Sequence, residues 1–513
     1  MEVSKDHLPT LAASSLVNAE LREMAASVLY SRLHLRVGEY MGPGRRPRRG
    51  LNPIPRRGQV GLALTSASLP HNRNRVRTLV LEGTCWEDSF SEKVLLDALR
   101  QFQRLERLSF NLQCPRWDYV EGSDRLDSTT VVEAISIINN QNRVSLRELT
   151  LNFVVEQLED DSLVILLQNN LIKLSLLDVP GYVLLETTPL KTLECLTELQ
   201  VRINPYNFKQ NKPSSFTEVF GVISNNCHNL KSLTLGVIRA DLNEELFDSV
   251  ARLHCLEELC LEYSFRVGYH DGFSPREPLT TDFPPLRTLK VFTLRYKSIR
   301  ELNLDVPVVC KWIKHVISLS PIERVNFRPF YQPRTCHPIP KCSWDILTDH
   351  LADKHADTLR SFDLRAGFVR KTAMKAVLSK CRRLEEFEVA TGEGSLMLLP
   401  RFSSNLPNLS KARFEFRTMK GTRHALQLDS AKAAEIMEAS GHLRRLIVND
   451  DEWKGSWVLE GGVLKYLVTS QSSNDERRKG DEERSPLPIS HFSTQDPWTS
   501  FEDPWVQGAD AEW

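Results

Sequence analysis

Thirteen times between Val76 and Val448 the chain places apolar residues at the first, fourth and sixth positions of a six-residue segment. Two examples are Leu146-Arg-Glu-Leu149-Thr-Leu151 and Leu230-Lys-Ser-Leu233-Thr-Leu235. The copies begin at residues 76, 105, 146, 171, 196, 230, 256, 286, 322, 359, 384, 409 and 443. Alternation of apolar and polar positions predicts a short strand in each copy, with Leu233 in the core and Thr234 facing outward.

The intervals between copies predict helices, because they carry apolar residues at helical spacing. Helix start signals stand at Ser215 with Glu218, at Asp241 with Glu244, and at Ser128 or Thr129. A further short helix is expected from Val60 to Ser68. A strand and a returning helix, repeated with right-handed connections, give a parallel sheet on one side and helices on the other.

This motif resembles that of leucine-rich repeats, whose units bury their apolar side only when neighbours stack on them. We therefore expect an α/β fold, a leucine-rich-repeat solenoid with a parallel concave sheet, convex helices and a short helical N-terminal cap. The expected organisation is a cap at 1–36, a connector with a first helix at 37–75, the solenoid at 76–469 and a disordered acidic tail at 470–513.

Composition limits the partners and the location that we expect. The chain has 513 residues with 66 basic and 66 acidic ones, so its overall charge does not attract nucleic acid or membrane. The sequence shows no apolar stretch of about 18 residues and no secretory leader, and we expect the protein in the cytoplasm or nucleus. Six arginines between Gly42 and Gly58 could attract nucleic acid or an import receptor, or could lie in a solvated connecting loop.

No catalytic or cofactor motif stands out, so neither an enzyme nor a bound cofactor is expected. Cysteines recur just before the first leucine of several repeats, and we expect Cys195, Cys227, Cys255 and Cys381 to be buried, reduced thiols. Cys336-His337 and Cys342 lack the paired spacing of a zinc site, so no metal is expected.

The first 36 residues are different in kind. Asp6 and Asn18 can each cap a short helix, and the second helix carries an apolar stripe of Leu21, Met24, Ala25, Val28 and Leu29. The segment from Ser4-Lys5-Asp6-His7-Leu8 through Leu16-Val17 to Leu33-His34-Leu35 resembles the later half of an F-box followed by the first strand of a fungal F-box and leucine-rich-repeat protein. The usual Leu-Pro-acidic opening of an F-box has no counterpart here.

That resemblance implies docking to a Skp-type adaptor of a cullin-based ubiquitin ligase. The adaptor contacts it implies are Leu8, Leu11, Leu16 and Val17. The chain would then recruit a protein substrate, and other subunits would carry out the chemistry. Two alternatives stay open: the two helices merely cap the solenoid, or the whole chain is a protein-interaction scaffold unrelated to ubiquitin.

The substrate surface is expected on the concave face, where strand side chains alternate away from the core. The repeats beginning at 256, 286, 322, 359 and 384 place outward Glu258, Cys260, Glu262, Thr288, Lys290, Phe292, Arg324, Asn326, Arg328, Ser361, Asp363, Arg365, Glu386, Glu388 and Ala390. We expect partner contacts from Lys290, Arg324, Asn326, Arg328 and Arg365, with Arg324, Arg328 and Arg365 side by side. Such a basic zone favours an acidic or phosphorylated target, unless Asp363, Glu386 and Glu388 neutralise it internally.

Two further segments add aromatic side chains. Irregular stretches that follow the strands carry Phe265, Tyr269, Phe330 and Tyr331, which have the composition of an interface core. The acidic tail repeats Asp-Pro-Trp at Asp496–Trp498 and Asp503–Trp505 and ends in Trp513. Three roles stay open for these tryptophans: short docking motifs, contact with the solenoid, or no role.

Overall fold

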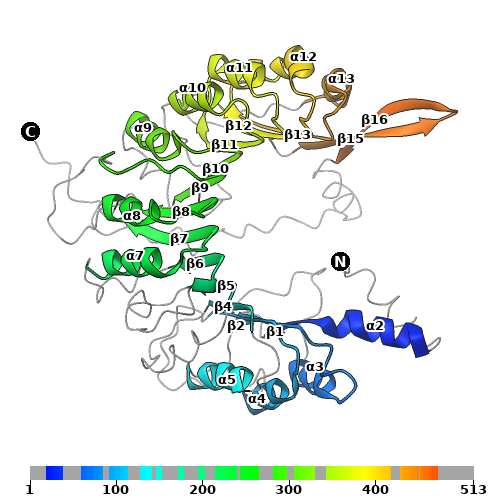
Figure 1. Cartoon of the computed structure of the whole chain (residues 1–513). Coiled ribbons are helices and arrows are strands. Elements are labelled where there is room, and N and C mark those ends of the chain that lie inside the picture. Colours follow the sequence, from blue (N-terminus) through cyan, green and yellow to red (C-terminus); the bar gives the residue numbers. More distant parts are fainter. Residues whose placement is uncertain are drawn as a thin grey trace, which may run out of the picture.

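The computed structural model describes residues 19–37, 59–84, 92–113, 128–140, 146–152, 171–177, 194–202, 214–239, 243–264, 281–296, 306–329, 343–417, 428–449 and 451–471. Within these ranges, sixteen strands form one sheet whose spatial order follows the chain from β1 to β16. Figure 1 shows this sheet as the inner layer of an arc, with the helices as the outer layer. The prediction of an α/β solenoid with a concave parallel sheet and convex helices is confirmed.

Each of the thirteen motif copies forms one strand, from β2 to β14, and β1 precedes them. The strands are β1 (Arg32–Val37), β2 (Thr78–Thr84), β3 (Arg107–Gln113), β4 (Glu148–Asn152), β5 (Lys173–Leu177), β6 (Glu198–Arg202), β7 (Ser232–Arg239), β8 (Glu258–Ser264), β9 (Val291–Tyr296), β10 (Arg324–Pro329), β11 (Ser361–Phe368), β12 (Glu386–Thr391), β13 (Lys411–Phe416) and β14 (Arg445–Val448). All of these pair in parallel with their neighbours.

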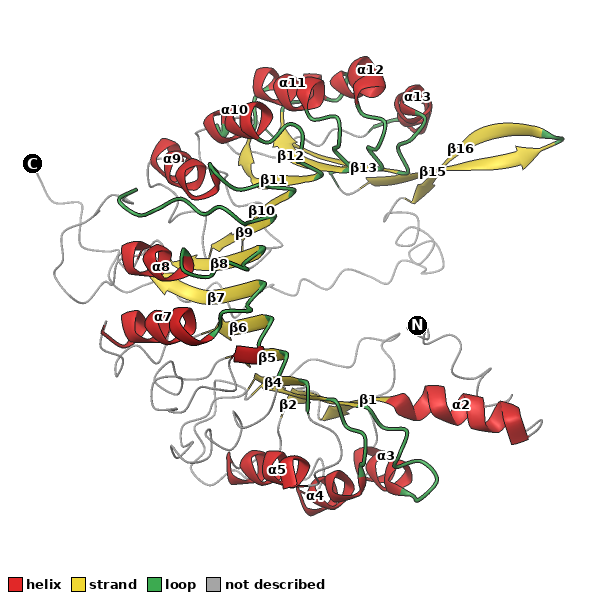
Figure 2. Cartoon of the chain, in the orientation of Figure 1, coloured by secondary structure: helices red, strands yellow, loops and turns green. Residues whose placement is uncertain are grey.

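The sheet ends in an antiparallel hairpin of β15 (Asp451–Glu460) and β16 (Val463–Gln471), which pairs with β14. Figure 2 shows the hairpin projecting beyond the last helix. Beyond its pairing with β14, the hairpin is anchored to the chain before that strand, because the Trp457 indole N–H donates to the Gly441 carbonyl and the Tyr466 hydroxyl donates to the Leu443 carbonyl.

The described helices lie on the convex side, except α2, which projects from the N-terminal end of the sheet (Figure 1). They are α2 (Ala19–Ser31), α3 (Gln59–Ser68), α4 (Glu92–Gln101), α5 (Ser128–Asn140), α7 (Ser214–Asn226), α8 (Asn243–Val250), α9 (Val306–Ile317), α10 (Asp345–Lys354), α11 (Lys371–Lys380), α12 (Leu398–Phe402) and α13 (Ser430–Ser440), with short 3₁₀ turns at Glu393–Ser395 and Ser403–Asn405. The short helix expected from Val60 to Ser68 is α3. None of the described helices is long and apolar enough to span a membrane.

Local sequence sets the helix ends and the buried faces. Asp429 caps α13 by accepting a hydrogen bond from the Ala431 N–H, and Gly441 ends the helix at φ 58°, a left-handed conformation that glycine adopts without strain. The expected start signals lie within two residues of the observed starts of α5, α7 and α8. In α8 the apolar residues at helical spacing, Leu246, Phe247 and Val250, are buried.

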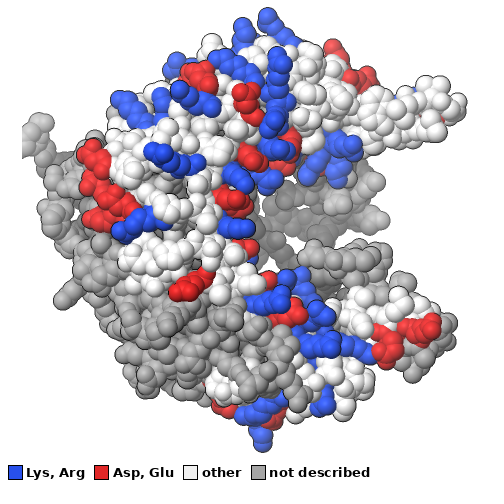
Figure 3. Space-filling view, in the orientation of Figure 1, with Lys and Arg blue, Asp and Glu red and all other residues white. Residues whose placement is uncertain are grey.

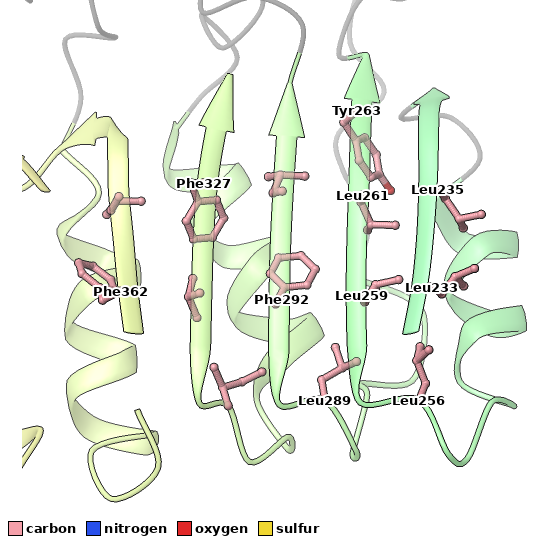
Figure 4. Packing of buried hydrophobic residues seen from close by; sticks show 14 of the residues in the cluster. Leu233, Leu235, Leu256, Leu259, Leu261, Tyr263, Leu289, Phe292, Phe327 and Phe362 are labelled. Atoms are coloured by element: carbon pink, nitrogen blue, oxygen red, sulfur yellow. The ribbon is translucent and has the colours of Figure 1, made fainter. Parts of the chain in front are cut away.

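The core lies between the sheet and the helices. Leu233, predicted to be a core residue, is 1% exposed, and Thr234 beside it is half-buried, so the strand phase of this repeat is confirmed. Figure 4 shows the inward residues of successive strands aligned toward the helices. Burying each such side chain contributes about 1.5 to 3 kcal/mol, and each does so only when the neighbouring repeat covers it.

One repeat has a different phase from the one predicted. The copy assigned to residue 286 begins at Leu289, because Phe292 pairs laterally with Leu259 and Val325, and Leu294 pairs with Leu261 and Phe327. Phe292 and Leu294 have no exposed surface. The prediction that Phe292 faces outward is wrong; Val291, Thr293 and Arg295 hold the concave positions of β9, while Thr288 and Lys290 precede the strand.

Candidate partner-binding surface

The concave face consists of lateral rows of polar side chains, one residue from each strand. Two rows alternate in charge. At the entrance to the strands, Lys290 lies 3.0 Å from Glu257, and Arg360 lies 3.5 Å from Glu323 and 2.9 Å from Glu385. In sheet order this row reads Glu257, Lys290, Glu323, Arg360, Glu385. Lys290, an expected partner contact, is therefore part of an internal ion-pair row.

The second row lies one residue farther along the strands. In the earlier repeats it also alternates basic and acidic side chains. Arg107 pairs with Glu148 at 2.9 Å, and Lys173 pairs with Glu198 at 2.5 Å. These exposed pairs each contribute little to stability, about 0 to 1 kcal/mol. The charges engaged in these pairs are, however, less available to a binding partner.

Glu262 sits in a clamp of two arginines. Its oxygens lie 3.1 Å from Arg202 on β6 and 3.3 Å from Arg295 on β9, and its side chain is only 4% exposed. The pair with Arg202 crosses over β7 at Gly236, where an added Cβ would lie 2.4 Å from the Glu262 carboxylate. Glu262 extends from the concave side of its strand, as predicted for an outward position, but the two arginines cover its carboxylate.

Arg365 is neutralised where we expected a free cation. Its guanidinium bonds twice to Asp363, at 2.9 and 2.8 Å, and lies 3.0 Å from Glu388. Asp363 and Glu388 are themselves almost fully buried. The internal neutralisation considered above is thus what occurs at Asp363 and Glu388, whereas Glu386 accepts a hydrogen bond from the Ser361 hydroxyl.

Arg324 and Arg365 do not stand side by side, contrary to the prediction. Arg324 pairs in register with Ser361, and Asn326 pairs with Asp363. Arg365 is therefore displaced by four residues from the level of Arg324, roughly 13 Å along the strand direction. Arg324 is exposed, and Asn326 donates to the Thr293 hydroxyl at 3.3 Å. Arg328 lies in β10, but its side chain is outside the described residues.

A cationic row that we did not assign lies farther along the face. Lys411 on β13 pairs in register with Arg445 on β14, and Arg445 pairs with Lys454 on β15. Figure 3 shows basic side chains gathered at the inner side of the sheet near the base of the hairpin. Lys411 and Arg445 could have been found from the motif itself, since each follows the first apolar residue of its copy by two positions. Lys454 could not, because its position depends on the antiparallel hairpin.

The remaining expectations divide between described and undescribed residues. Phe265, Tyr269, Phe330 and Tyr331 lie outside the described residues, as do the adaptor contacts Leu8, Leu11, Leu16 and Val17. So do Cys336, Cys342, the arginine-rich segment and residues 472–513. Within the described ranges, no group of three potential metal ligands occurs.

The cysteine prediction is half right. Cys227 and Cys381 are buried, and burial raises the pKa of each thiol to about 12, so both are unreactive. Cys195 and Cys255 are exposed, contrary to the prediction. They lie one residue before the first leucine, in the turn that enters the strand, where only that leucine points inward.

Comparison with known proteins gives one distant structural similarity to report. No family model matches the sequence, and neither does any curated protein. Among solved structures, a chain from the crystal structure of the Rad7 and Elc1 complex in yeast is similar over 85% of this chain and 100% of that chain. The sequence identity is 13% and the TM-score 0.39, a similarity too weak to bear on function.

Proposed function

We propose that this protein is an F-box-type, substrate-recruiting subunit of a cullin-based ubiquitin ligase. Its N-terminal segment would dock on a Skp-type adaptor, and its concave face would hold a protein target, acidic or phosphorylated in the contacted segment. The protein itself would not be an enzyme and would act in the cytoplasm or nucleus. The proposal rests on the F-box resemblance of residues 4–35 together with one structural observation.

That observation is the exposed apolar face of α2. Leu21, Met24 and Val28 are 38%, 65% and 40% exposed, and their spacing of three and four residues puts them on one side of the helix. Of the expected stripe, only Ala25 is fully buried. Figure 1 shows α2 projecting from the end of the solenoid, which leaves this face open to a partner. A helix used only to cap the solenoid would turn these side chains inward.

Two polar contacts on α2 reach the solenoid, and neither involves the exposed residues Leu21, Met24 and Val28. Glu23 pairs with Arg75, which lies between α3 and β2. The Tyr30 hydroxyl hydrogen-bonds with Ser66 of α3 at 3.0 Å. These contacts, the burial of Ala25 and the direct continuation into β1 attach the helix to the solenoid, so a substitution at the exposed Met24 should leave the repeats folded.

Co-purification with Skp and cullin subunits tests the proposal. Met24→Asp should abolish capture, because burying an unpaired carboxylate in an interface costs several kcal/mol. The matched control is Leu62→Asp on α3, where the side chain is 71% exposed and the same charge should be tolerated. Leu16→Asp extends the test to the contacts implied by the resemblance. Circular dichroism should show all three variants folded.

Two outcomes would contradict the proposal. If the wild-type chain captures neither subunit, the ligase role fails and the alternative of a scaffold unrelated to ubiquitin takes its place. If Leu62→Asp weakens capture as much as Met24→Asp, the exposed face of α2 is not the docking surface.

A further inference from the structure

The last strands of the concave face carry more cations than carboxylates. The outward positions of residues 411–417, 445 and 452–454 hold Lys411, Arg413, Glu415, Arg417, Arg445, Glu452 and Lys454. Five of these are basic and two are acidic. On β12, Lys411 pairs in register with Glu386 and contacts Glu388 at 2.5 Å, a carboxylate that it shares with Arg365. This end of the face therefore keeps an excess of positive charge.

The two acids within the group are also shared. Glu452 lies 3.0 Å from Arg445 and 3.9 Å from Lys454, and Glu415 lies 3.6 Å from Arg413 and 2.5 Å from Arg417. The Nε atoms of Arg413 and Arg417 are buried without a hydrogen-bond partner among the described atoms. These buried Nε atoms are not accessible to a ligand, so docking would involve the more exposed cations, Lys411, Arg445 and Lys454, whose side chains are 24%, 47% and 46% exposed.

The hairpin extends this surface with apolar side chains. Residues directly opposite in an antiparallel pair share a face, so Lys454 lies with Thr469, Ser456 with Leu467, and Val458 with Lys465. Val458, Val463 and Leu467 are 39%, 60% and 45% exposed. A ligand with both carboxylates and large apolar groups fits such a combination.

The chain contains one segment of this composition. Residues 485–513 have five carboxylates and neither lysine nor arginine. Tryptophans lie beside these acids in the two Asp-Pro-Trp motifs, at Trp498 and Trp505. We propose that the acidic tail that follows β16 docks on this surface, with its carboxylates on the row of Lys411, Arg445 and Lys454 and its tryptophans on the apolar side chains of the hairpin.

The covalent link to β16 favours binding of the tail over binding of a separate molecule. Thr469, two residues before the end of β16, pairs in register with Lys454, so the tail begins beside the row. The chain between Gln471 and Asp496 is long enough to reach the row, since a random coil of about 25 residues spans roughly 25 to 30 Å, more than the width of three strands. Tethering gives an effective concentration in the millimolar range, so even weak contacts are populated.

The carboxylates that lie among these cations argue against a nucleic acid as the ligand of this surface. Glu388, Glu415 and Glu452 lie within the basic group and would repel a continuous phosphate backbone. Separate acidic side chains can avoid them. The proposed docking of the tail does not depend on whether the protein serves a ubiquitin ligase.

Zero-length carbodiimide cross-linking of the full chain, read by mass spectrometry, tests the proposal. The reagent joins a lysine amine to a carboxylate in contact with it. We expect links from Lys411 or Lys454 to Asp496, Glu502 or Asp503. Their yield should fall severalfold between about 0.05 and 0.5 M salt, because screening shortens electrostatic reach, and should not change on dilution. The Lys173–Glu198 pair, 2.5 Å apart, is the internal positive control.

Three results would overturn the proposal. The first is that Lys411 and Lys454 link only to Glu388 and Glu452 while the control link forms, which would leave the tail without a place on this surface. A tail link that weakens on dilution would assign the contact to a second copy. Finally, duplex DNA or RNA that binds the wild type but not a Lys411→Gln, Lys454→Gln variant would assign the row to nucleic acid.

Discussion

Two neighbouring substitutions in β9 should have very different costs. Phe292 has no exposed surface, and its ring centroid lies 6.3 Å from that of Phe327. Phe292→Ala removes this ring from a packed core and should lower the free energy of unfolding by roughly 3 to 5 kcal/mol. Val291 is half-buried on the concave side. Val291→Ala removes two methyl groups worth about 0.8 kcal/mol each when fully buried, so it should cost less than about 1 kcal/mol.

Urea denaturation followed by circular dichroism measures the difference. With a slope of about 3 kcal/mol per molar urea, Phe292→Ala should lower the midpoint by roughly 1 to 1.7 M. Because a solenoid can unfold in more than one step, hydrogen exchange of the β9 and β10 amides gives the same comparison locally. If Val291→Ala proves as damaging as Phe292→Ala, the repeat begins at residue 286 after all, and the register described for β9 is wrong.

Two further outcomes are expected. Leu233→Ala should cost roughly 2 to 5 kcal/mol in urea denaturation and Thr234→Ala less than about 0.5 kcal/mol; equal costs would contradict the strand phase. The protein should also lose roughly 1 to 3 kcal/mol of stability as the pH falls from about 6.5 to 4, because burial lowers the pKa of His350 and of His355 from 6.5 to about 4. In that window the unfolded chain binds protons that the folded chain does not, and a His350→Gln, His355→Gln variant should show a flatter profile.

The repeat pattern predicts the strands because its cause is local. A strand with alternating burial needs apolar residues two apart, and Leu233 and Leu235 satisfy this wherever the unit lies in the chain. The pattern fails at residue 286, because both Leu286-x-x-Leu289-x-Val291 and Leu289-x-x-Phe292-x-Leu294 fit it. Only pairing with the strands on either side, through Leu259 and Val325, selects the second phase.

The surface was harder to predict than the core. That Asp363 neutralises Arg365 was visible in the sequence, since residues two apart on a strand share a face. The part played by Glu388 required the register between β11 and β12. Lys454 joins the cationic row only because the chain reverses direction after β14, and the repeat motif does not predict that reversal. On a repeat protein, the pairing of a charged side chain thus depends more on the strands beside it than on its neighbours in the sequence.

The alternating row at the strand entrances restricts how such a chain can change in length. From Glu257 to Glu385 the charge reverses at every repeat. Loss of the single unit that carries Arg360 would set Glu323 beside Glu385, and like charges on adjacent strands are destabilising by roughly 0.2 to 1 kcal/mol. Loss or duplication of two consecutive units would restore the alternation. In this part of the chain, duplication in evolution and shortening by design should both be tolerated better in even numbers of repeats.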